Sequence, residues 1–286
     1  MVTTRSDRLV KRQVDLNETT QGEWERFSSH RRRVTDLCLK ASGGTAAILG
    51  AGNCNDVDLT ELAAHFERIH LVDLDGAALS TAAARQREDV RPKLVEHGGV
   101  DLGLVDTLSA WGDREPSSND IEEALSRMRE EPRPPAANLD LCVSSCLLTQ
   151  LFTSVVDRVG PHHPRVVEIV CGLRSRHLRT LAQSLRPGAV GVLVSDMVSS
   201  DTAPGLRDLP PHGLRGAMDA FLRAGNFFTG TNPYIVASSL TTDPQLKEMT
   251  TEVVLHSPWI WDIAPERSYL VFAVSFRRLR LLTTAP

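Results

Sequence analysis

The stretch AILGAGNCNDVDLTEL, residues 47–62, decides how the rest of the chain is interpreted. A short apolar run ending at Leu49 leads into Gly50-Ala51-Gly52, and residues 58–66 then show helical spacing of apolar side chains. A strand that enters a glycine turn and continues as a helix is the ligand-binding unit of open α/β sheets, because glycine lets the backbone approach a ligand closely. The stretch therefore predicts a nucleotide site at the end of the first strand.

A carboxylate stands where such a site needs one. Asp73, in HLVDLD, ends the second apolar run and lies 21 positions after Gly52. An acidic side chain at this place can accept hydrogen bonds from both hydroxyls of an unphosphorylated ribose. The turn and the acid together predict a cofactor that contains adenosine.

The charge of the turn distinguishes between such cofactors. A dinucleotide site has a third glycine and holds a pyrophosphate at the helix N-terminus, but here Asn55 takes that position and Asp56 and Asp58 follow. Carboxylates in the first helical turn satisfy the positive end of the helix dipole and would repel a diphosphate. They suit an ammonium and a sulfonium, which the methionine half of S-adenosylmethionine (SAM) carries. Helix capping by both aspartates is the alternative interpretation.

Strands and helices alternate after this unit. The further strands that we predict are 69–72, 93–96, 139–143, 189–195, 251–255 and 269–276, and the intervening helices include 77–87, about 147–159 and 165–185. Near-continuous apolar strands joined by helices predict a parallel sheet covered on both faces, and the short last connection predicts an antiparallel pair. We expect an α/β, doubly wound, mostly parallel seven-stranded sheet with an antiparallel C-terminal strand pair and an N-terminal helical extension.

Residues 1–40 are expected to form that extension. Residues 1–22 are polar and show no period, so we interpret them as a loosely held arm. An amphipathic helix is predicted over 24–39. Its residues Trp24, Phe27, His30 and Arg31 are interpreted as ordinary packing, with a lid over the cofactor as the alternative.

Residues 41–286 are expected to form the main domain, with insertions at about 104–138 and 199–249. The first insertion is polar and proline-rich, with one short helix over 120–129. We interpret it as a surface insertion; a substrate lid is the alternative. The second contains a helix near 213–224 and another that starts at Pro233.

These segments resemble class I SAM-dependent methyltransferases over roughly residues 40–280. ILGAGNCND is similar to the first motif of that family, VDLD to the second, and GGVDL more loosely to the segment near the adenine. LDLCVSSCLLTQL, residues 139–151, looks like the fourth-strand motif, whose end lines the methyl-transfer site. Asn53 and Asn55 depart from the pattern, because many members carry a third glycine or another small residue in this loop.

The resemblance implies SAM as cofactor and S-adenosylhomocysteine (SAH) as product. The cofactor contacts that it implies are Gly50, Ala51, Gly52, Asn53, Asp56, Asp73, Leu74, Asp101, Leu102, Ser144 and Ser145. Helix capping is the alternative role for the two serines.

Residues on the acceptor side follow from their position after the fourth and fifth strands. Asp196 and Tyr234 are the candidate catalytic residues, which would orient or deprotonate an acceptor. The candidate pocket residues are Gln150, Phe227, Phe228 and Asn232. A loop cap for Asp196 and plain core packing for the two phenylalanines are the alternatives.

Composition narrows the partners. With 32 basic and 36 acidic side chains the net charge is −4, which gives no reason to expect nucleic acid, so a small-molecule acceptor is preferred. Five cysteines without a C-x-x-C pair indicate free thiols, and no apolar run is long enough to span a membrane, so we expect a cytoplasmic protein. Nine histidines without metal-site spacing predict no metal.

Two other functions stay open. An NAD-dependent oxidoreductase would use the same crevice, although no Tyr-x-x-x-Lys pair supports it. A non-catalytic protein that binds SAM or SAH as a sensor is the other alternative.

Overall fold

The computed structural model describes residues 5–112 and 114–280. Its α-helices are α1 (Arg5–Thr20), α2 (Ser28–Cys38), α3 (Leu59–His65), α4 (Gly76–Ala84), α5 (Val105–Ser109), α6 (Ser118–Arg129), α7 (Leu148–Val159), α8 (Val166–Ser184), α9 (Leu214–Arg223) and α10 (Pro233–Thr242). Short 3-10 helices are η1 (Arg91–Lys93), η2 (Leu206–Asp208) and η3 (Pro211–Gly213). The strands are β1 (Thr45–Leu49), β2 (Arg68–Val72), β3 (Leu94–His97), β4 (Leu139–Ser145), β5 (Leu185–Ser199), β6 (Thr250–Leu255), β7 (Trp259–Ala264) and β8 (Arg267–Arg278).

One sheet holds all eight strands. Its order is β3-β2-β1-β4-β5-β8-β6, and β7 also pairs with β8. The first five strands in this order run parallel, and β8 runs antiparallel to β5, β6 and β7. The predicted doubly wound α/β fold is confirmed, with one strand more than the seven expected. The additional strand, β7, lies in the connection between the last two predicted strands, where Asp262 interrupts the apolar pattern.

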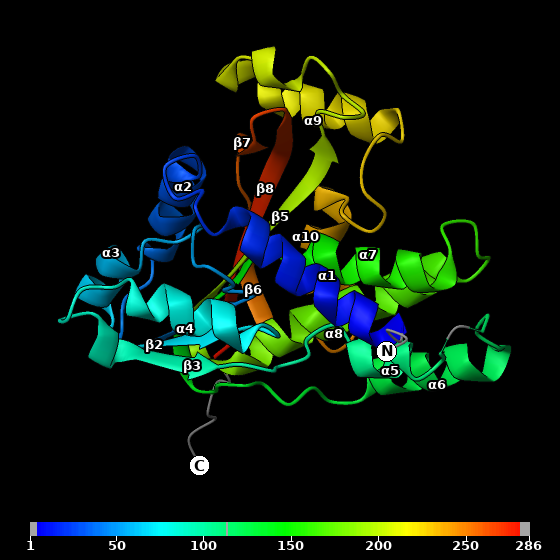
Figure 1. The fold of residues 1–286 in the computed structure, drawn as a ribbon, viewed down its shortest axis with the longest axis horizontal. Helices are drawn as coiled ribbons and strands as arrows, with labels where there is room; N and C mark the ends of the chain where they lie inside the picture. The colour runs from blue at the N-terminus through cyan, green and yellow to red at the C-terminus, as the bar shows by residue number, and fades with distance from the viewer. Residues whose placement is uncertain (1–4, 113, 281–286) are drawn as a thin grey trace.

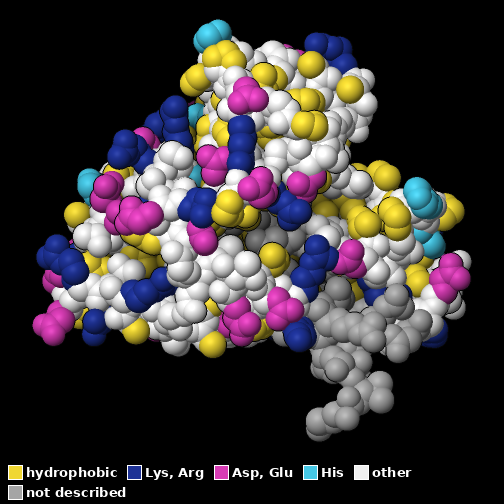
Figure 2. Space-filling model, turned by 45° about the horizontal axis from the view of Figure 1, so that its top comes forward, with side chains coloured by type: hydrophobic (Ala, Val, Ile, Leu, Met, Phe, Trp, Pro, Cys, Tyr) yellow, Lys and Arg dark blue, Asp and Glu magenta, His cyan; other side chains and the backbone are white. Residues whose placement is uncertain are grey.

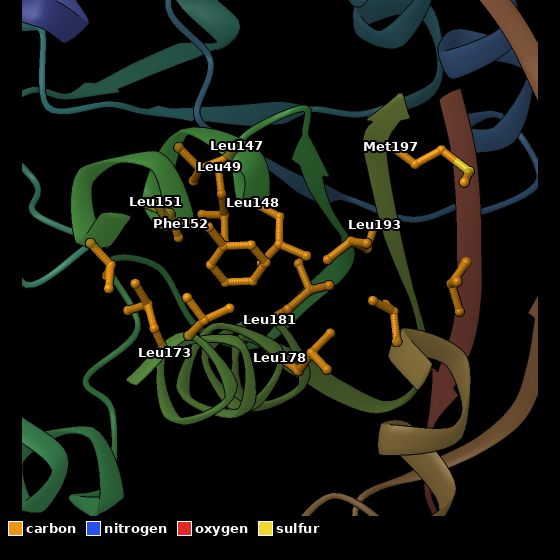
Figure 3. Packing of buried hydrophobic residues seen from close by; sticks show 14 of the residues in the cluster. Leu49, Leu147, Leu148, Leu151, Phe152, Leu173, Leu178, Leu181, Leu193 and Met197 are labelled. Carbon is orange, nitrogen blue, oxygen red and sulfur yellow. The ribbon is translucent and has the colours of Figure 1, made fainter. Parts of the chain in front are cut away.

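The two faces of the sheet carry separate apolar cores. Ala47 and Leu49 of β1 face the core of α6, α7, α8 and α10, whereas Ala46 and Ile48 face the core of α2, α3 and α4. Because side chains alternate along a strand, a continuous apolar run fills both layers. Figure 3 shows the first core, where Phe152 of α7 lies among leucines of α7 and α8. Figure 1 shows the helices on either side of the sheet.

The N-terminal segment differs from the loosely held arm that we expected. Its described part forms α1, which contacts α5 and α4 and crosses in front of the sheet in Figure 1. Residues 1–4 lie outside the described residues. Helix α1 could not be predicted from the sequence, because few of its side chains are apolar and its hydrogen bonds to the glycine turn form only in the folded chain.

Both insertions belong to the compact structure. In the first, Ile121, Leu125 and Met128 of α6 are buried against the core beside α8. Helix α6 therefore adds to the helical layer beside α8. In the second, α10 starts at Pro233 as predicted and packs on β6 and β8. None of the helices within residues 5–112 and 114–280 is long and apolar enough to cross a membrane.

Candidate cofactor and acceptor site

Two adjoining cavities lie at the carboxyl ends of the parallel strands. The larger cavity, about 240 Å³, lies between α1, the glycine turn, the ends of β4 and β5, and the β7–β8 hairpin. The smaller cavity, about 30 Å³, lies beside the ends of β2 and β3, and Gly50 lines both. Acidic and basic side chains gather near the middle of the face shown in Figure 2. An open α/β sheet binds its ligands at this edge.

The glycine turn has the geometry that the sequence predicts. Gly50 and Gly52 have φ angles of 73° and 45°, in the left-handed region that favours glycine. A Cβ atom on Gly50 would lie 2.9 Å from the Cβ of Leu147. The backbone N–H of Gly50 donates to the carbonyl of Val72 at 2.9 Å, which ties the turn to β2.

Asp73 holds the turn from the end of β2. Its Oδ2 accepts a hydrogen bond from the Gly52 N–H at 2.8 Å, and its Oδ1 accepts one from the Asp75 N–H at 2.9 Å. Burial raises the pKa of Asp73. Asp73 lines the smaller cavity together with Leu74, Asp101 and Leu102. The three segments implied to surround adenosine therefore converge on one place.

Helix α1 lies directly on the glycine turn. The side-chain amide of Asn53 donates to the carbonyl of Asn17 at 2.5 Å, and that of Asn55 donates to the carbonyl of Thr20 at 2.6 Å. The Asn17 amide donates to Asp75 at 3.1 Å. The two asparagines that depart from the family pattern thus bind α1, so the turn and the helix form one wall of the larger cavity.

Asp56 and Asp58 have different roles. Asp58 caps α3, since its Oδ1 accepts from the N–H groups of Thr60 and Glu61. Asp56 lines the larger cavity, where its Oδ2 accepts from the Ser145 hydroxyl at 3.2 Å. Its Oδ1 is buried without a hydrogen-bond partner among the described residues. Burial raises the pKa of Asp56 to about 7. The capping interpretation holds for Asp58 and fails for Asp56.

His30 lies behind Asp56 as a buried, neutral side chain. The Trp259 indole N–H donates to His30 Nδ1 at 3.1 Å, and Nε2 lies 3.6 Å from Asp56 Oδ1 and 3.9 Å from Cys146 Sγ. Burial lowers the pKa of His30 to about 3. Because Nδ1 accepts from Trp259, Nε2 carries the proton of the neutral ring. His30, Asp56 and Cys146 could otherwise surround a metal ion, but a protonated Nε2 cannot ligate one.

One side of the larger cavity combines aromatic side chains with one carboxylate. Asp196 lies within β5, which continues four residues beyond the predicted end, and its Oδ1 accepts from the Thr149 hydroxyl at 2.6 Å. Burial raises the pKa of Asp196 to about 6. The ring centroid of Trp261 lies 5.1 Å from that of Phe27 and 5.8 Å from that of Tyr269. These three rings form the aromatic wall of the larger cavity. Asp196 is therefore a side chain of the cavity and not a loop cap.

The structure brings most of the predicted site residues together. The larger cavity is lined by Gly50, Ala51, Gly52, Asn53, Asp56, Ser145, Gln150 and Asp196. It is also lined by Phe27, the residue that precedes α2, whose ring packs on Trp261 of β7. Helix α1 lies on the glycine turn, and Arg31 of α2 also donates to the carbonyl of Asn55 at 3.1 Å.

Several predicted residues lie elsewhere. Tyr234 is 45% exposed on α10, and its hydroxyl donates to Asp219 at 2.6 Å. Asn232 caps α10. Phe227 packs against the core, and Phe228 contacts the Tyr269 ring with centroids 5.9 Å apart. The loop after α9 therefore supports the aromatic wall, and its side chains do not line either cavity.

Ser144 points to the face of the sheet opposite to that of Ser145, where its hydroxyl lies 2.7 Å from Nε2 of the buried His177. Burial lowers the pKa of His177 to about 4, from 6.5. The imidazole therefore takes up a proton at a higher pH in the unfolded chain than in the folded one. Protonation of the unfolded chain lowers the free energy of unfolding as the pH falls from 6.5 toward 4, whereas above pH 6.5 this loss is absent.

We expect the free energy of unfolding of the wild type to fall by about 2 kcal/mol more than that of His177→Gln between pH 7 and pH 5. Urea titrations of both proteins at the two pH values measure this difference. The comparison cancels the other titrating groups, which both proteins share. Parallel pH dependence would contradict a neutral, buried His177.

Sequence reasoning missed part of the cavity. The lining residues that were not predicted are Arg12, Leu16, Asn17 and Thr20 of α1, Thr149 and Thr153 of α7, and Trp261, Ile263, Arg267 and Tyr269 of the β7–β8 hairpin. The only available signal was the position of Thr149 after the fourth strand. Nothing in the sequence relates α1 or the hairpin to the glycine turn.

Comparison with known proteins finds similarity to solved structures at low sequence identity. No protein-family model and no curated protein matches it. The N-methyltransferase NodS from Bradyrhizobium japonicum is 13% identical, with a TM-score of 0.45 over 91% of this chain and 99% of that one. A putative O-methyltransferase from Nostoc punctiforme is 12% identical, with a TM-score of 0.47 over 96% and 62%. A possible exported protein from Bordetella parapertussis is 16% identical, with a TM-score of 0.43 over 90% and 68%.

Proposed function

We propose that this protein is a SAM-dependent methyltransferase that acts on an oxygen or nitrogen atom of a small molecule. The observation that carries the proposal is the division of the site at Gly50. Asp73 and Asp101 lie in the smaller cavity on one side, and Asp56 and Asp196 lie in the larger cavity on the other. A ligand that spans both has its sugar near Asp73 and a cationic part near Asp56.

The partly buried carboxyl group of Asp56 fits SAM better than a dinucleotide. Oδ1 of Asp56 has no hydrogen-bond partner among the described residues, and Oδ2 accepts only from Ser145. When ionised, Asp56 therefore places a negative charge beside the turn, where a dinucleotide would place its pyrophosphate. An ammonium group there offsets the cost of burying the carboxylate. The same site in an NAD-dependent oxidoreductase would place like charges together.

The side chains of this chain would bind the cofactor, orient the acceptor and exclude water from the site. The cofactor, when bound, supplies an electrophilic methyl carbon. Asp73 would accept hydrogen bonds from the ribose, while Asp56 and Ser145 would hold the amino group of the methionine part. Helix α1 would keep water from the larger cavity, and Asp196 would orient the acceptor there.

The proposal is tested by titrating the full chain calorimetrically with SAM, SAH and NAD, followed by an assay of SAH release with small hydroxyl and amino compounds. We expect SAM and SAH to bind at one site per chain and NAD to give no heat. Binding of NAD without a response to SAM or SAH would overturn the proposal. Tight binding of SAM with no turnover on any compound would favour the sensor.

A further inference from the structure

We infer that the acceptor is a small ammonium compound whose nitrogen atom receives the methyl group after Asp196 takes its proton. The inference rests on the proposed function and names the substrate class of the same site. It follows from the charge of the larger cavity, from its aromatic wall and from its size.

The larger cavity has more negative than positive charge to offer a ligand. Asp56 and Asp196 both line it. Arg267 at its rim already pairs with Asp201, its Nε lying 2.9 Å from Oδ2. The second arginine at the rim, Arg12, pairs with Asp157. Both guanidinium charges are thus compensated on the outer side.

One of the two carboxylates remains after the cofactor is bound. SAM has an ammonium, a sulfonium and a carboxylate, which sum to one positive charge, and Asp56 matches that charge. Asp196 is buried, and Thr149 donates to its Oδ1. No other described side chain donates a hydrogen bond to the Asp196 carboxylate or forms an ion pair with it, although the Ser195 hydroxyl donates to the Asp196 backbone carbonyl. An ammonium acceptor would compensate this carboxylate, whereas an alcohol would leave it buried and unpaired and a carboxylate would repel it.

The aromatic side chains of this cavity suit a cation. Trp261 contacts both Phe27 and Tyr269, and all three line the same cavity as Asp196. Aromatic faces attract ammonium groups through their quadrupole, most strongly where water is excluded. The ionised Asp196 and the wall together bind the charged amine and place its nitrogen in the cavity.

The volume limits the part of the acceptor that enters. About 240 Å³ must hold the methionine part of the cofactor as well as the acceptor. Complete drug-sized ligands occupy pockets of about 300–1,000 Å³. An amino group on a short aliphatic arm or a single ring fits this space, while a larger body would have to stay outside the rim.

The reaction balances with the groups present. Asp196 takes one proton from the ammonium group and becomes neutral. The freed lone pair on nitrogen forms the N–C bond to the methyl carbon, and the C–S bond breaks with its electron pair kept by sulfur. The products are the methylated amine, which carries one positive charge as an ammonium ion, and the neutral thioether SAH.

The test compares benzylamine with benzyl alcohol, which differ in the charged group and little in shape. Binding of each to the SAH-saturated protein is measured by ligand-observed NMR titration at pH 7.5. We expect the amine to bind at least about tenfold more tightly than the alcohol, which corresponds to about 1.4 kcal/mol. We expect Asp196→Asn to remove this preference while it keeps SAH binding.

Asp208→Asn is the matched control, because Asp208 is an exposed carboxylate in η2 that does not line either cavity. It should keep the preference for the amine. Equal binding of the two compounds, no saturable binding of the amine, or an unchanged preference in Asp196→Asn would each overturn the inference. Failure of SAH to bind at all would instead overturn the proposed function, and the prior SAH titration separates these results.

Discussion

Replacement of Asp73 by asparagine is expected to weaken SAH binding about a hundredfold. The carboxylate would accept hydrogen bonds from the ribose, and it already accepts from Gly52 and Asp75. Asparagine keeps the volume but replaces one acceptor oxygen with a donor, which faces an N–H group of the turn. Lost hydrogen bonds to a charged group cost about 1.5–3 kcal/mol, and each 1.4 kcal/mol is tenfold in affinity. Calorimetric titration with SAH measures the change.

Glu96→Gln is the control for this change. Glu96 is an exposed carboxylate on β3, where it accepts a hydrogen bond from Ser80, and it does not line either cavity. We expect its SAH affinity to match that of the wild type. An Asp73→Asn protein that is folded by circular dichroism and binds SAH as the wild type does would show that the ribose lies elsewhere.

The second large effect is expected at Asp56 and depends on pH. Its pKa is raised to about 7, so the free protein gains the negative charge as the pH rises through 7. An ammonium ligand binds the ionised form, so SAH affinity should rise between pH 6 and pH 8, and binding below pH 7 should release a proton. Asp56→Asn should bind SAH about tenfold more weakly at pH 8 and lose most of this pH dependence.

Titrations in buffers of different ionisation enthalpy measure the released proton. The groups near Asp56 are Ser145, Arg31, the neutral His30, the Cys146 thiol, whose pKa burial raises, and Asp196. Asp196, with a pKa of about 6, is the one whose titration overlaps, and the Asp196→Asn variant isolates it. Glu61→Gln, at an exposed carboxylate in α3, is the matched control. Proton release that persists in Asp56→Asn and is absent from Asp196→Asn would assign the titration to Asp196 and contradict the role given to Asp56.

The glycine turn and Asp73 could be predicted because their constraints are local. A positive φ requires glycine at Gly50 and Gly52, and the acid follows at the end of the next strand. Apolar runs long enough to fill two cores likewise indicate β1, β4 and β5. These parts of the fold repeat a short-range pattern that one stretch of sequence contains.

The rest of the site depends on contacts between distant residues. Trp259 meets His30 across 229 positions, and α1 meets the turn through backbone carbonyls that any sequence has. Tyr234 has an aromatic ring and a hydroxyl in a promising loop, but the fold turns it outward to Asp219. Tyr269 instead lines the cavity, because β8 runs beside β5. Residue type cannot distinguish these two tyrosines; the packing of strands far apart in the sequence does.

The central claim is that the negative turn after β1 receives the cationic amino-acid part of SAM, and a crystal structure of the full chain with SAH tests it most directly. We predict the ribose hydroxyls on Asp73, the adenine beside Asp101 and Leu102, and the amino group within hydrogen-bond distance of Asp56. Adenosine bound elsewhere, or a turn that stays empty in crystals grown with saturating SAH, would contradict the claim.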